Sequence, residues 1–149
     1  MSNITIKING TEVTVPAGST ILDAAKKINI KIPTLCYCPD VGCGVPNKPA
    51  SCRLCLVEAT GVRGPRKILA PACATPVAPN MEVWTNSQRA RNARRTVLEL
   101  LLSDHPQDCL TCAKSQDCEL QKLAQEYDCD AGYFEGESIH YPLDTSSPA

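Results

Sequence analysis

Apolar and polar residues alternate near the N-terminus of the chain. Two alternating runs carry the apolar positions: Ile4, Ile6 and Ile8, then Val13 and Val15. A period of two puts these side chains on one face of a strand. Between the runs stands Asn9-Gly10, a dipeptide suited to the two positive φ angles of a type I′ turn. The pattern therefore predicts a β-hairpin.

A helical spacing replaces the alternation after Gly18. One face of the predicted helix carries Ile21, Leu22, Ala25 and Ile28. Thr20 with Asp23 three positions later is typical of a capping box. Residues 36–50 are rich in Gly, Pro and Cys, which indicates a loop whose shape depends on something bound. Further apolar runs of strand length lie at 54–61, 66–77 and 82–86. This order of elements predicts an α+β fold.

From Ser87 onward the pattern is again helical. The apolar face of this helix is predicted to consist of Ala90, Ala93, Val97, Leu100 and Leu101. The helix is expected to stop before Pro106. Its arginines, predicted to lie largely on other faces, form either a solvated surface or a docking surface for an acidic partner: Arg89, Arg91, Arg94 and Arg95. A second helix is predicted over 118–127, with Asp117 as its cap.

The most informative feature of the composition is its large number of cysteines. The 149 residues include ten cysteines but one Phe and one Trp, so we expect two modest cores, each reinforced by something other than hydrophobic burial. The N-terminus lacks a secretory pattern, and no run of eighteen apolar residues occurs, so we expect a cytoplasmic chain without membrane insertion. Thiols stay reduced in the cytosol, which favours metal ligation over disulfides. The net charge of -1 disfavours a nucleic-acid partner.

The candidate metal ligands fall into two groups along the chain. The first is Cys36, Cys52, Cys55 and Cys73, and the second is His105, Cys109, Cys112 and Cys118. Thiolates suit iron-sulfur clusters and zinc alike, and four ligands per site is usual for either. Cys38, Cys43 and Cys129 are left over and are interpreted as small, partly buried thiols.

Spacing bears on the choice between zinc and iron. Zinc sites mostly pair two short two-ligand knuckles, whereas Cys36 and Cys73 are single ligands on either side of one Cys-x2-Cys pair. The second group crowds four ligands into one loop, with the last at the start of a helix. The positive end of the helix dipole there favours an anionic cluster. Iron-sulfur clusters are favoured, and zinc stays open as the alternative.

Several motifs, taken together, resemble a known family. They are "IPTLCY", "SCRLCLVE", "PACATPV", "LLLSDHPQDCLTC", "DCELQKLAQEY" and "YPLDTSSP". In this order they resemble the N-terminal region of the large iron-sulfur subunit of bacterial complex I and of the catalytic subunits of NAD-linked iron-only hydrogenases. The resemblance covers nearly the whole chain.

The resemblance implies three segments. Residues 1–78 would form a β-grasp, ferredoxin-like domain with a 2Fe-2S cluster, and residues 79–129 a small, mostly helical 4Fe-4S domain. Residues 130–149 would be an extended tail. Carried over by position, Cys36, Cys52, Cys55 and Cys73 match the 2Fe-2S ligands; His105, Cys109, Cys112 and Cys118 match the 4Fe-4S ligands.

Two departures from the family pattern qualify this assignment. The fifteen residues between Cys36 and Cys52 make a longer loop than the resemblance leads us to expect, and they include Cys38 and Cys43, either of which could replace Cys36. The chain also has no Cys-x2-Cys-x2-Cys-x3-Cys-Pro run and no hydrogenase active site, although relatives continue into further cluster domains.

The expected function is electron transfer without a catalytic site on this chain. We expect a flavin- and NAD(P)H-binding iron-sulfur subunit as partner, in an electron-bifurcating transhydrogenase or hydrogenase complex. The chain has no dinucleotide fingerprint of its own. Two alternatives remain: a zinc-stabilised interaction module without a redox role, and a fragment of a larger iron-only hydrogenase or dehydrogenase subunit.

Overall fold

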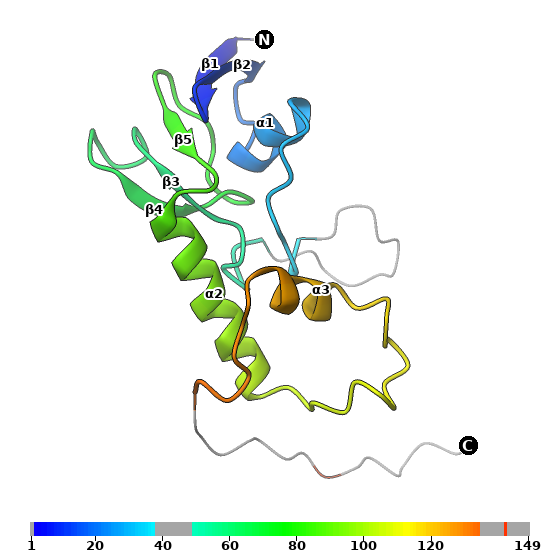
Figure 1. Cartoon of the computed structure of the whole chain (residues 1–149). Helices are drawn as coiled ribbons and strands as arrows, with labels where there is room; N and C mark the ends of the chain where they lie inside the picture. Colours follow the sequence, from blue (N-terminus) through cyan, green and yellow to red (C-terminus); the bar gives the residue numbers. More distant parts are fainter. Residues whose placement is uncertain (1, 38–48, 135–141, 143–149) are drawn as a thin grey trace.

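The structure is a computed structural model that describes residues 2–37, 49–134 and 142 (Figure 1). Cys38, Cys43 and most of the predicted tail lie outside these residues. The described elements are β1 (Asn3–Ile8), β2 (Thr11–Pro16), α1 (Ile21–Lys27), β3 (Leu56–Ala59), β4 (Ile68–Pro71), β5 (Glu82–Trp84), α2 (Gln88–Ser103) and α3 (Glu119–Glu126).

The N-terminal hairpin is confirmed. β1 and β2 pair in antiparallel register, with Ile6 opposite Val13. Asn9 has φ 50° and Gly10 has φ 85°, which is the left-handed backbone that an Asn-Gly turn requires. The capping box of α1 is confirmed as well. Thr20 accepts a hydrogen bond from the Asp23 backbone N–H at 3.2 Å, and its own N–H donates to the Asp23 carboxylate at 2.9 Å.

One mixed sheet holds all five strands, in the order β2-β1-β5-β3-β4. β1 and β5 run parallel in the middle, and every other pair is antiparallel. A hairpin followed by a helix and a sheet with a central parallel pair is the predicted β-grasp, ferredoxin-like arrangement. β5 lies beyond the boundary expected after residue 78, yet it is a central strand of this same sheet.

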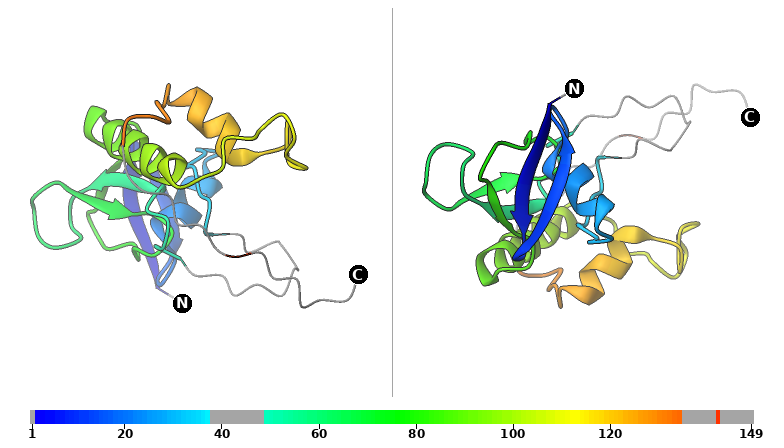
Figure 2. Two further views of the ribbon diagram at one scale, coloured as in Figure 1. Left: turned by 90° about the horizontal axis from the view of Figure 1, so that it is seen from below. Right: turned by 90° about the horizontal axis from the view of Figure 1, so that it is seen from above.

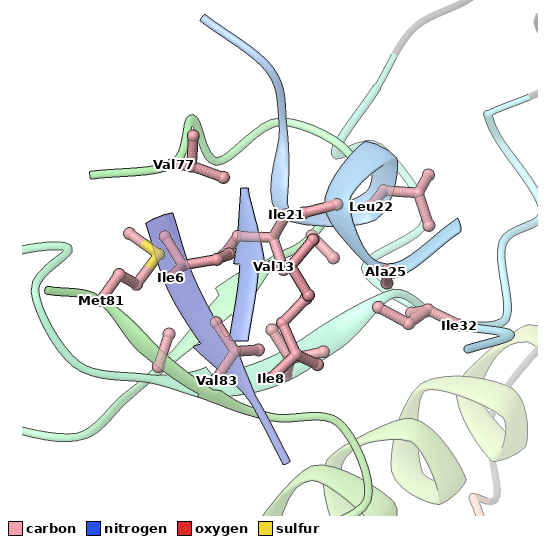
Figure 3. Close-up of a cluster of buried hydrophobic side chains, with 14 of the residues drawn as sticks. Ile6, Ile8, Val13, Ile21, Leu22, Ala25, Ile32, Val77, Met81 and Val83 are labelled. Atoms are coloured by element: carbon pink, nitrogen blue, oxygen red, sulfur yellow. The ribbon is translucent and has the colours of Figure 1, made fainter. Parts of the chain in front are cut away.

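The larger core lies between the sheet and α1 (Figure 3). The hairpin contributes Ile6, Ile8 and Val13, and α1 contributes Ile21 and Leu22. Met81, next to β5, and Val83, on β5, belong to the same cluster. The isoleucines Ile6, Ile8 and Ile21 are at most 1 % exposed. The alternating pattern and the helical pattern thus converge on one apolar layer.

The buried face of α2 differs from the predicted one. Arg94 and Leu98 are buried, at 3 % and 0 % exposure, whereas Leu100 is 51 % exposed. The prediction that the arginines lie away from the packed face is therefore wrong for Arg94, as is the placement of Leu100 and Leu101 on that face. The physical reason is that backbone carbonyls satisfy the Arg94 guanidinium, so a charged residue occupies a core position.

Two other arginines of α2 pair within the chain. Arg89 lies 3.7 Å from the Glu58 carboxylate, and Arg95 lies 2.8 Å from that of Glu99. Neither of the two predicted roles, a solvated face or a docking surface, therefore describes the whole cluster.

A second, smaller core joins α2 to α3. Its buried members are Leu54, Leu98, Leu123 and Tyr127. Figure 2 shows α2 and α3 side by side in both views. This core confirms the expectation of two modest cores.

The start of α3 corrects the predicted cap. Cys118 occupies the N-cap position and makes no side-chain capping bond. Asp117 instead accepts a hydrogen bond from the Lys122 ammonium group at 3.4 Å. Within the described ranges, no helix has the length and apolar character needed to cross a bilayer.

Candidate iron-sulfur sites

The four predicted 2Fe-2S ligands come from three segments of the first domain. Cys36 follows α1, Cys52 and Cys55 lie in the loop that leads into β3, and Cys73 follows β4. The Cys55 thiol donates to the Cys73 sulfur at 3.3 Å. Cys36 and Cys52 lie close enough for each thiol to shift the pKa of the other. The structure therefore brings the four sulfurs together as two pairs, which suits a cluster whose two irons each take two protein ligands.

Backbone N–H groups of the ligand loop point toward these sulfurs. The Ala50 N–H donates to Cys73 Sγ at 3.1 Å, and the Leu54 N–H lies 3.5 Å from Cys52 Sγ. Ala50 and Arg53 both adopt left-handed backbone, with φ 66° and 62°. Nothing in the residue types at these positions signals such a backbone. Hydrogen bonds to sulfur such as these are one way a protein tunes a cluster.

Burial and hydrogen bonds act in opposite directions on the pKa values of these thiols. Burial, with smaller contributions from Cys73 and Cys52, raises the pKa of Cys55 to about 12. Burial also raises the pKa of Cys36. For Cys52, burial acts in the same direction, but hydrogen bonds from the backbone of Leu54, Leu35 and Cys36 outweigh it and lower the pKa. A thiolate at Cys55 thus needs a cationic partner, which iron provides.

The second group of predicted ligands lines one small pocket. His105, Cys109, Cys112 and Cys118 line a pocket between the end of α2 and the start of α3. Cys109 and Cys112 are exposed, and Cys118 is partly buried. The Lys114 N–H lies 3.4 Å from Cys112 Sγ. The His105 N–H donates to the Leu102 carbonyl at 3.2 Å, which holds the histidine close to the end of α2.

The remaining described cysteine is Cys129, which packs against the second core. Its sulfur lies 4.0 Å from the Arg95 carbonyl oxygen, and burial, helped by the nearby Glu99 carboxylate, raises its pKa. It behaves as the partly buried thiol expected from the sequence. In the part of the chain that the structure describes, all cysteines are free thiols. No group of three His, Cys, Asp or Glu side chains there is arranged to hold a single metal ion.

The second core contains neighbours of the predicted ligands of both candidate sites. Leu35 precedes Cys36, and Leu54 sits between Cys52 and Cys55; both pack in that core. From the other side, Leu123 enters it on the helix that begins after Cys118. Figure 1 shows the segments leading to the first site running down toward α2 and α3. The same leucines therefore support the ligand segments of both sites.

Comparisons with known families account for both regions. Residues 1–88 match the family described as the 2Fe-2S iron-sulfur cluster binding domain. Residues 94–131 match the NADH-ubiquinone oxidoreductase-G iron-sulfur binding region. These matches confirm the two expected cofactors, a 2Fe-2S cluster and a 4Fe-4S cluster.

Individual relatives are larger proteins. The chain is 57 % identical to the NADP-reducing hydrogenase subunit HndD of Solidesulfovibrio fructosivorans over 148 residues, 99 % of this chain and 25 % of that protein. It is 37 % identical to the NADH-ubiquinone oxidoreductase 75 kDa subunit of Reclinomonas americana over 131 residues, 88 % of this chain and 18 % of that protein.

A solved structure agrees with the sequence relatives. The crystal structure of an NAD+-reducing [NiFe]-hydrogenase in the H2-reduced state superposes with a TM-score of 0.80 at 33 % identity. The superposition covers 99 % of this chain and 58 % of that one. The chain spans a quarter or less of the curated relatives named above. A 4Fe-4S region of the NADH-ubiquinone oxidoreductase-G type lies at residues 94–131. The sheet, the paired cysteines and the match over residues 1–88 show that the chain belongs to the 2Fe-2S iron-sulfur cluster binding domain family.

Proposed function

We propose that the chain is an electron-transfer unit that relays electrons between a flavin-containing, NAD(P)H-oxidising partner and a further acceptor. The observation that carries the proposal is that the eight predicted ligands form two separate groups, and that leucines next to both groups pack in one apolar core. The first group is Cys36, Cys52, Cys55 and Cys73; the second is His105, Cys109, Cys112 and Cys118.

Clusters bound at these ligands would supply one-electron steps, whereas a flavin accepts a hydride with two electrons at once. The chain's own residues hold the ligands and shield the first site, since Cys55 and Cys73 are buried. The names of two relatives, an NADP-reducing hydrogenase subunit and an NADPH-Fe(3+) oxidoreductase subunit, support an NAD(P)H-linked complex. A cytoplasmic location fits thiol ligands that must stay reduced.

A role as part of a larger subunit is the second candidate. The small share of each relative that the chain covers supports it. Under either candidate, we assign no catalytic residue to this chain. Proteins that co-purify with the native chain would identify the partner and separate the two candidates.

Metal content tests the cofactors directly. Protein purified without oxygen should be brown and contain about six irons per chain, the sum for one 2Fe-2S and one 4Fe-4S cluster. Acid-labile sulfide should be present in proportion. Colourless protein with two zinc ions and no sulfide would instead support a zinc-stabilised interaction module.

Single substitutions test the division of ligands. Cys55→Ser should abolish the 2Fe-2S signal in electron paramagnetic resonance of reduced protein and leave the 4Fe-4S signal. Cys112→Ser should do the reverse. Cys129→Ser is the matched control, and we expect both signals to persist. If either ligand variant stays folded and loses both signals, the division into two groups is wrong.

His105 and Cys43 have their own tests. Imidazole is neutral, so replacing it with a thiolate adds negative charge and should lower the reduction potential of the 4Fe-4S cluster in His105→Cys. An unchanged potential would count against ligation by His105. Cys43→Ala should leave both clusters intact, and loss of the 2Fe-2S cluster would assign the first ligand to Cys43 in place of Cys36.

A further inference from the structure

Among the described residues, the buried cation Arg94 bonds only to neutral groups. The side chain is 3 % exposed. Its Nε and Nη2 donate to the Leu56 carbonyl at 2.9 and 2.7 Å, and Nη2 also donates to the Thr85 carbonyl at 2.7 Å. Nη1 donates to the Tyr127 hydroxyl at 3.1 Å. These bonds tie α2 to β3, to the segment after β5 and to the end of α3.

No carboxylate balances this charge in the described part of the chain. Glu58 pairs with Arg89, and Glu99 pairs with Arg95, whereas Arg94 forms no ion pair there. Burying an unpaired charge is costly, and even a fully hydrogen-bonded guanidinium gains from a nearby negative charge. The position of Arg94 therefore suggests an anion close by that these residues do not supply.

The candidate anion is the cluster of the first site. Leu56, whose carbonyl accepts two bonds from Arg94, directly follows the predicted ligand Cys55. Four thiolates and two sulfides give a 2Fe-2S cluster a net negative charge, and reduction makes it more negative. A fixed cation at the adjacent backbone favours the reduced state, and the low local dielectric strengthens the effect.

We propose that Arg94 is a positioning residue that sets the reduction potential of the 2Fe-2S cluster, which it raises through its buried positive charge. The proposal rests on the proposed 2Fe-2S site. It also predicts an asymmetry between the two clusters. Arg94 contacts Tyr127, which follows the last residue of α3, and the rise of that helix places about 13 Å between Tyr127 and the predicted ligand Cys118. The 4Fe-4S potential should therefore respond less.

The test is a redox titration of the full chain, purified with its clusters and followed by electron paramagnetic resonance. Arg94→Gln removes the charge but keeps a hydrogen-bond donor. We expect the 2Fe-2S midpoint potential to become more negative, and the 4Fe-4S midpoint to shift less. The matched control is Arg89→Gln, which removes the same charge from a largely exposed side chain of the same helix. Its 2Fe-2S midpoint should shift less than that of Arg94→Gln.

Tyr127→Phe separates charge from packing. It removes the bond to α3 and leaves the Arg94 charge in place, so the 2Fe-2S midpoint should stay at the wild-type value. If Arg94→Gln does not fold, Arg94→Lys takes its place in the test. Lysine keeps the positive charge, so the 2Fe-2S midpoint potential should stay near the wild-type value. A wild-type midpoint in Arg94→Gln, or a clear fall in Arg94→Lys, would overturn the role of the charge while leaving the cluster assignment intact. A wild-type chain without a 2Fe-2S signal would overturn the proposed function and this inference together.

Discussion

Truncation of Leu98 tests which face of α2 is packed. Leu98 is completely buried against Leu54 and Leu123, whereas Leu100, two positions later, is 51 % exposed. The hydrophobic pattern of the sequence predicts that Leu100 is buried in the core, whereas the structure buries Leu98. Both substitutions to Ala are compatible with a helix, because Ala is the best helix former. A difference between them therefore reports on burial.

The expected magnitudes follow from burial. Leu→Ala at a fully buried site costs about 2–5 kcal/mol, the sum of lost transfer free energy and the cavity left behind. A half-exposed leucine loses little contact, so Leu100→Ala should change the free energy of unfolding by no more than about 0.5 kcal/mol. Because four buried residues make up the second core in the described part of the chain, Leu98→Ala should lie toward the upper part of its range.

The assay is denaturant unfolding of the full, cluster-loaded chain, followed by far-ultraviolet circular dichroism. Visible absorbance, recorded in the same titration, reports cluster loss. Leu98→Ala should unfold at a clearly lower denaturant concentration than wild type, and Leu100→Ala close to it. Equal losses in the two variants, or a larger loss in Leu100→Ala, would refute the described packing of α2.

Three further predictions concern the backbone and one thiol. Ala50→Gly should leave the free energy of unfolding unchanged or slightly raised, because glycine relieves the left-handed strain at φ 66°. The control Ala93→Gly, within α2, should lower the free energy of unfolding by about 1 kcal/mol in the same titration. Gly10→Ala should destabilise the hairpin by about 1 kcal/mol, because φ 85° disfavours a Cβ although no atom lies within 4 Å of it; an unchanged unfolding midpoint would contradict the turn. Alkylation of Cys129 by iodoacetamide, followed by mass spectrometry, should stay slow until the pH exceeds the usual range for a thiol, because a raised pKa leaves less thiolate at any given pH. A reaction as fast as that of a free thiol at pH 8 would contradict this.

Local sequence patterns predict the structure correctly where the interaction that stabilises an element joins residues close together in the sequence. The Asn9-Gly10 turn and the Thr20–Asp23 capping box depend on neighbours in sequence, and both form as predicted. The grouping of the cysteines followed from their spacing and from the family resemblance. The family matches confirm the two cofactors, and the assignment of individual ligands stays a prediction.

Local patterns give a wrong prediction where a residue's interaction partners are distant in the sequence. Arg94 is buried because carbonyls of Leu56 and Thr85, from two other parts of the chain, accept its hydrogen bonds. Helical periodicity predicts that an arginine is exposed to solvent, because the pattern carries no information about acceptors from other parts of the chain. The left-handed backbone of Ala50 has the same kind of origin, since its N–H points at the sulfur of Cys73.

The sequence by itself determined the hairpin and the helices, with their ends to within a few residues, because each depends on short-range geometry. It also predicted the two groups of ligands from their spacing and from ligand chemistry. Only the tertiary structure decided which face of α2 is packed and how the two regions meet. Those features arise from contacts between segments such as β3, α2 and α3, and burial there depends on which acceptors and apolar side chains the folded chain brings together.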